Sequence, residues 1–140
     1  MKKSLLAAVM VLMMGGAVFA AEEGRSQVDY EKVAREAGER RDKLREAAPD
    51  MMGAFGELGK AALKDGALST KTKELIAVAL SVSAQCDVCI TSHVRNAIKA
   101  GVTREEIAEA VGVAVLMGGG PKSVYAATVL EAYDQFSAKE

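Results

Sequence analysis

Aromatic residues and proline are scarce in this sequence. It has no tryptophan, three phenylalanines, three tyrosines and two prolines among 140 residues, and half of its residues are hydrophobic, with alanine, valine, leucine and methionine prominent. Sheets favour aromatic and β-branched residues, whereas alanine and leucine favour helices. No segment alternates apolar and polar residues over a sustained run. The sequence therefore predicts an all-α fold.

A block of positive charge is also missing. The chain has 18 basic and 19 acidic residues, for a net charge of −1, and its lysines and arginines do not cluster. Proteins that bind nucleic acid or anionic membranes through charge carry such clusters. The composition therefore indicates no nucleic-acid partner.

The first 20 residues differ in character from the rest. Lys2 and Lys3 precede an uncharged apolar stretch, and Val18 and Ala20 occupy the minus-three and minus-one positions of a small-residue cleavage site. This is the layout of a secretory signal peptide. We expect cleavage after residue 20 and export to the periplasm. An uncleaved membrane anchor is the alternative, because the uncharged stretch is close to the minimum length that spans a bilayer.

The remaining residues, 21–140, suffice for a single domain. We expect its N-terminal helices within 21–67 and its core within 68–140. Apolar periodicity, caps and breakers predict about six helices, at residues 28–47, 51–64, 70–85, 86–100, 104–117 and 121–136.

Two of these helices carry specific expectations. The helix over 51–64 is expected to bury its larger apolar residues, among them Phe55 and Leu58. Residues 75–85 carry no charge. A helix that is apolar on every side is buried in a core or in an oligomer interface, so this segment is predicted to lie in one of the two.

Both cysteines and the only histidine fall within eight residues, as Cys86, Cys89 and His93. Positions three and four apart share a helix face, so the thiols are neighbours within reach of a disulfide, and His93 lies one turn beyond Cys89. Cys86 falls in the first helical turn, where free amides and the helix dipole favour a thiolate. Glu74 would orient His93 as a base if the two helices pack together.

Three interpretations of these four residues remain open. A redox pair needs two thiols at this spacing and a base, and all are present. A structural disulfide is compatible with an exported protein, although the bridge closes a very small loop and restrains little chain. A metal site would use Cys86, Cys89, His93 and Glu74 as ligands, but structural zinc sites usually hold two separated pairs.

The spacing of Glu74, Cys86, Cys89 and His93, with eleven, two and three residues between them, resembles the core motif of the alkyl hydroperoxidase D-like (AhpD-like) proteins. These belong to the carboxymuconolactone decarboxylase superfamily. The likeness extends from about residue 68 to residue 121. It includes the runs Lys73–Ala77, Gly101–Ile107 and Gly119–Pro121.

The resemblance implies an AhpD-like helical bundle that assembles into homo-oligomers, either trimers or hexamers. It also implies thiol-dependent reduction of hydroperoxides with no cofactor and no metal. Cys89 would then be the thiolate that attacks the peroxide and passes through a sulfenic acid. Cys86 would resolve that acid to a redox-active Cys86–Cys89 disulfide, and Glu74 and His93 would relay the proton. Decarboxylation is not expected, because the decarboxylases of the superfamily generally lack the cysteine pair.

Two features depart from the family pattern. The best-known members carry a histidine between the two cysteines, where this chain has Val88. The second departure is the signal peptide, because cytosolic members draw electrons from a lipoyl-bearing or thioredoxin-type protein and an oxidising periplasm supplies no such pool by default. Either an exported thiol reductant protein serves this chain, or the chain works in thiol–disulfide exchange with little peroxidase activity.

Overall fold

The computed structural model describes residues 28–138, and within that range the chain forms helices and no strands. The predicted signal peptide at 1–20 lies outside the described residues. The six helices are α2 (Tyr30–Ala47), α3 (Pro49–Leu63), α4 (Thr70–Ala84), α5 (Asp87–Lys99), α6 (Arg104–Gly118) and α7 (Gly120–Ser137). The all-α prediction with about six helices is confirmed.

Local sequence signals set several helix boundaries. Pro49 occupies the first turn of α3, and Ala48 separates α3 from α2. The Ser69 side chain caps α4. Thr103 and Glu106 form a complete capping box at α6, in which each side chain bonds the other residue's backbone N–H. The Ser69 cap and the capping box satisfy backbone amides that a helix N-terminus leaves without partners.

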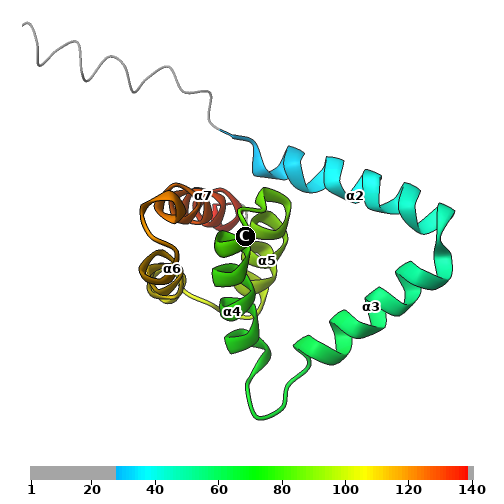
Figure 1. Cartoon of the computed structure of the whole chain (residues 1–140), viewed down its shortest axis with the longest axis horizontal. Coiled ribbons are helices and arrows are strands. Elements are labelled where there is room, and N and C mark those ends of the chain that lie inside the picture. Colours follow the sequence, from blue (N-terminus) through cyan, green and yellow to red (C-terminus); the bar gives the residue numbers. More distant parts are fainter. Residues whose placement is uncertain (1–27, 139–140) are drawn as a thin grey trace, which may run out of the picture.

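Helices α4 to α7 pack together as a bundle that holds the hydrophobic core (Figure 1). Its fully buried side chains include Val78, Val82, Ile90, Val94, Ile107 and Val129. The first turn of α2 joins this core through Tyr30, which is 2% exposed and donates a hydrogen bond from its hydroxyl to Glu131 at 3.1 Å.

Helices α2 and α3 form a V that extends away from the bundle (Figure 1). Every residue of α3 remains at least partly exposed, and Phe55 and Leu58 are each 64% exposed. The prediction that α3 buries these residues is wrong for the single chain. The reason is tertiary: α3 packs only against α2 and part of α4, so its apolar side chains meet no opposing layer.

The charge-free segment of α4 is buried on one face only. Val78 and Val82 point into the core with no exposure, whereas Ile76 and Leu80 are 45% and 62% exposed. The prediction of a core position thus holds for one face of the helix. Ile76 and Leu80 leave apolar surface on another face. Over residues 28–138, none of the helices combines the length and hydrophobicity that crossing a membrane requires.

Candidate redox site

The site lies at the corner between α4 and α5. Gln85 ends α4 in the left-handed conformation, with φ of 55°, and its N–H bonds back to Val82 at 3.1 Å. The N–H of Cys86 bonds to the Ser81 carbonyl at 3.2 Å. This pattern closes the C-terminus of a helix within two residues. Because the corner is so short, α5 folds back directly against α4.

Cys86 is the N-cap of α5, and Cys89 lies in the first turn. The two form a disulfide with their Cα atoms 5.2 Å apart, an ordinary separation for such a bond. The Cys89 backbone N–H donates to Cys86 Sγ at 3.3 Å, so the sulfur takes the acceptor role that serine or aspartate usually has at this position. In the reduced protein, the same amide and the helix dipole favour a thiolate at Cys86.

The packing of α4 on α5 brings Glu74 to His93, as the sequence predicts for packed helices. His93 Nδ1–H donates to Glu74 Oε2 at 2.8 Å, since a carboxylate can only accept. The Glu74 side chain is 3% exposed and that of His93 is 30% exposed. In the neutral imidazole with Nδ1–H bonded to Glu74, Nε2 is the acceptor.

Glu74 differs from the other buried polar residues of the described chain. Ser81 and Thr91 are also buried, but each donates its hydroxyl to a carbonyl of its own helix at 2.7 Å. Glu74 bonds a residue of another helix. A buried carboxylate is costly unless a partner compensates for its lost hydration. The placement of Glu74 therefore fits a role in orienting His93 rather than in packing.

In the structure, the four candidate metal ligands bond one another in pairs. Within 28–138, no three His, Cys, Asp or Glu side chains are arranged to hold a metal ion. Cys86 and Cys89 bond each other, and Glu74 occupies Nδ1 of His93.

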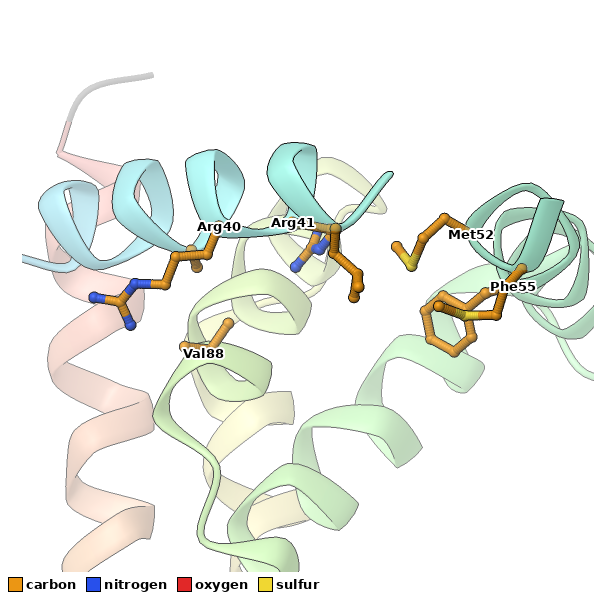
Figure 2. A pocket seen from close by; sticks show the side chains of 8 residues that line it. Arg40, Arg41, Met52, Phe55 and Val88 are labelled. Carbon is orange, nitrogen blue, oxygen red and sulfur yellow. The ribbon is translucent and has the colours of Figure 1, made fainter. Parts of the chain in front are cut away.

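A groove that reaches α5 at Val88 was not foreseen from the sequence. It has a volume of about 500 Å³ and lies between α2, α3 and Val88 of α5 (Figure 2). Its apolar lining is Ala37, Leu44, Met51, Met52, Phe55 and Val88, and two arginines complete it. We call it the α2–α3 groove. The apolar positions on α2 follow the helical period, but only the tertiary arrangement places α3 opposite them.

Comparison with known proteins identifies the class. The model of the carboxymuconolactone decarboxylase family matches residues 49–132. The chain therefore belongs to this family, which includes decarboxylases and AhpD-like peroxidases. An uncharacterized protein of Cupriavidus necator is 43% identical over 95 residues, which cover 68% of this chain and 84% of that protein.

Solved structures show the same fold. A carboxymuconolactone decarboxylase family protein from Legionella pneumophila is 46% identical with a TM-score of 0.76, over 77% of this chain and 96% of that one. A family member from Thermotoga maritima, described with a suspected involvement in antioxidative response, is 29% identical with a TM-score of 0.64, over 77% of this chain and 94% of that one.

Proposed function

We propose that this protein is a thiol-dependent peroxidase that reduces hydroperoxides through Cys89 and Cys86. The observation that carries the proposal is the juxtaposition of a Cys86–Cys89 disulfide with the Glu74–His93 pair. A nucleophile, a base and a group that orients the base make up an activated thiol. The Thermotoga relative, described with a suspected involvement in antioxidative response, supports the same function.

The proposed reaction starts from the reduced pair. His93 Nε2 takes the proton of the Cys89 thiol, one helical turn away. The Cys89 thiolate attacks the terminal oxygen of the hydroperoxide, the O–O bond breaks, and the alkoxide leaves as an alcohol with the proton from His93. Cys89 is now a sulfenic acid. The Cys86 thiol attacks its sulfur, water leaves, and the disulfide forms.

Turnover requires an external dithiol, which becomes oxidised as it reduces the disulfide. We propose a thiol reductant protein in this role, exported like this chain if residues 1–20 act as a signal peptide. Both cysteines are partly exposed at the start of α5, which supports access by such a partner.

The test is consumption of tert-butyl hydroperoxide by the purified protein with dithiothreitol as the dithiol. Wild type should turn over, whereas Cys89→Ser and His93→Ala should lose activity by about 100-fold or more. Asn96→Ala, an exposed change one turn further along α5, is the matched control and should retain activity. If wild type consumes peroxide no faster than Cys89→Ser, the proposal is wrong.

The order of the two cysteines has its own test. In Cys86→Ser, a single equivalent of peroxide should leave a sulfenic acid on Cys89 that dimedone labels, because the resolving thiol is gone. The opposite result would assign the peroxide-attacking role to Cys86. In that case dimedone would label Cys86 in Cys89→Ser and would not label Cys89 in Cys86→Ser.

Thiol–disulfide exchange is the second candidate. The capped position of Cys86 favours it, because a stabilised thiolate makes a good leaving group and a more oxidising disulfide. It predicts oxidation of reduced protein thiols by the disulfide form, together with negligible peroxide turnover. A reduction potential near that of strongly oxidising exchange proteins would separate the two functions.

We further propose that the chain forms a homo-oligomer, a trimer or a hexamer. The end of α4 meets the start of α7 where Lys122 Nζ donates to the Ser83 carbonyl at 2.7 Å. Leu116 and Met117, 80% and 81% exposed, lie at the C-terminal end of α6. Exposed apolar surface of this kind marks interfaces. Light scattering should give three or six chain masses, and Met117→Glu should lower that number.

A further inference from the structure

We propose that the α2–α3 groove binds an amphiphilic carboxylate, an alkyl chain that ends in an anionic head group. Hydroperoxides of this class would be the substrates brought to Cys89. That delivery step rests on the proposed peroxidase function, whereas the binding itself does not.

The apolar part of the groove fits an alkyl chain. In Figure 2, Met52 and Phe55 project from α3 toward α2, and Val88 lies below α2 on α5. Phe55 is 64% exposed in the absence of a ligand. Covering such a ring with an alkyl chain removes apolar surface from water, which is favourable by about 25 cal/mol per Å². Methionine adapts its shape to flexible ligands.

The charged part of the groove fits an anion. Arg40 and Arg41 line it from α2, and the guanidinium of Arg40 lies at the end away from α3 (Figure 2). Glu36 partly neutralises Arg40 at 3.4 Å. Among the described residues, Arg41 forms no ion pair. Two cations against one paired carboxylate leave the groove positive, and arginine binds carboxylates with particular geometric fit.

The size of the groove suits a small molecule. Its volume of about 500 Å³ lies within the range of roughly 300–1,000 Å³ found for small-molecule sites.

Val88 connects the groove to the redox pair. It lines the groove and stands between Cys86 and Cys89 in the sequence, in the first turn of α5. A chain lying on Val88 therefore contacts the same helical turn that carries Cys89. A polar histidine at this position would interrupt the apolar floor. The valine thus acts as a specificity determinant for an apolar chain.

The test measures binding of decanoate and of 1-decanol to the oxidised full chain by titration calorimetry. Neither probe is a peroxide, so the result is independent of turnover. Wild type should bind decanoate about fivefold more tightly than 1-decanol, because an exposed charge pair is worth up to about 1 kcal/mol. Arg41→Glu should abolish this preference, whereas Lys43→Glu, an exposed charge reversal on the same helix outside the groove, should keep it.

A matched pair of variants tests the apolar wall. Phe55 and Leu58 are equally exposed on α3, but only Phe55 lines the groove. Phe55→Ala should weaken both probes by about threefold or more, because apolar contact area is lost, and Leu58→Ala should leave both affinities unchanged. No measurable decanoate binding, equal affinity of wild type for the two probes, or equal effects of the two alanine variants would overturn the proposal. Binding without peroxide turnover would retain the groove and reject only the peroxidase function.

Discussion

The Glu74–His93 hydrogen bond allows a quantitative prediction. Glu74→Gln keeps the size of the buried side chain, and the amide oxygen can still accept the proton of His93 Nδ1. In the proposed mechanism, the change removes the negative charge that would stabilise the imidazolium form during proton transfer. It therefore separates the electrostatic role of Glu74 from its role in positioning.

The size of the effect follows from the geometry. The two bonded atoms are 2.8 Å apart, and Glu74 is 3% exposed. Unit charges about 4 Å apart attract by about 4 kcal/mol at the effective dielectric constant of 20 typical near a protein surface. His93 is 30% exposed, so water screens part of this. A net loss of about 1.4–2.7 kcal/mol corresponds to a rate reduced 10- to 100-fold.

The assay is the rate of Cys89 alkylation by iodoacetamide as a function of pH, in a Cys86→Ser background. The midpoint of the profile should move toward the ordinary thiol pKa of about 8.5 in Glu74→Gln. Glu109→Gln, an exposed change on α6, is the control and should not move it. With His93→Ala present, Glu74→Gln should have no further effect, because its action passes through the imidazole. Additive effects of the two changes, or an unmoved midpoint, would refute the reasoning.

Three further predictions concern stability. Burial first, and then the Glu131 carboxylate, raise the pKa of Tyr30 to about 12. The folded state therefore holds this proton more tightly, and the stability it adds below pH 10 is lost as the pH rises from 10 through 12. Between pH 10 and pH 12, the free energy of unfolding of wild type should therefore fall by about 2 kcal/mol more than that of Tyr30→Phe, as measured by denaturant unfolding. Thr103→Ala should lower the unfolding free energy by about 1 kcal/mol, because it breaks the capping box with Glu106. Gln85→Gly should raise it by about 1 kcal/mol, since glycine adopts the left-handed conformation without a Cβ clash.

Each of these has a contradicting result. Parallel stability curves for Tyr30→Phe and wild type above pH 10 would show that the phenol does not titrate as described. An unchanged midpoint in Thr103→Ala would mean that solvent caps α6 equally well. A loss of stability in Gln85→Gly would mean that the glutamine side chain contributes more than its backbone strain costs.

The sequence by itself determined the helical fold and the residues of the candidate site. Helix ends depend on local groups, and so Pro49, Ser69 and the Thr103–Glu106 box marked them without tertiary information. Cys86, Cys89 and His93 lie on one short helical segment, where spacing alone sets their proximity. The link to Glu74 required only that two consecutive helices pack together, as they do.

The tertiary structure decided what periodicity leaves open. The apolar pattern of α3 shows that Phe55 and Leu58 belong to an apolar helix. Their burial depends on whether another element covers these side chains, and in the single chain none does. Likewise, nothing local in α2 indicates that its arginines face Val88 across a groove. Contacts between segments distant in sequence depend on the path of the chain in space. That path placed a groove with apolar walls and two arginines against Val88 of α5.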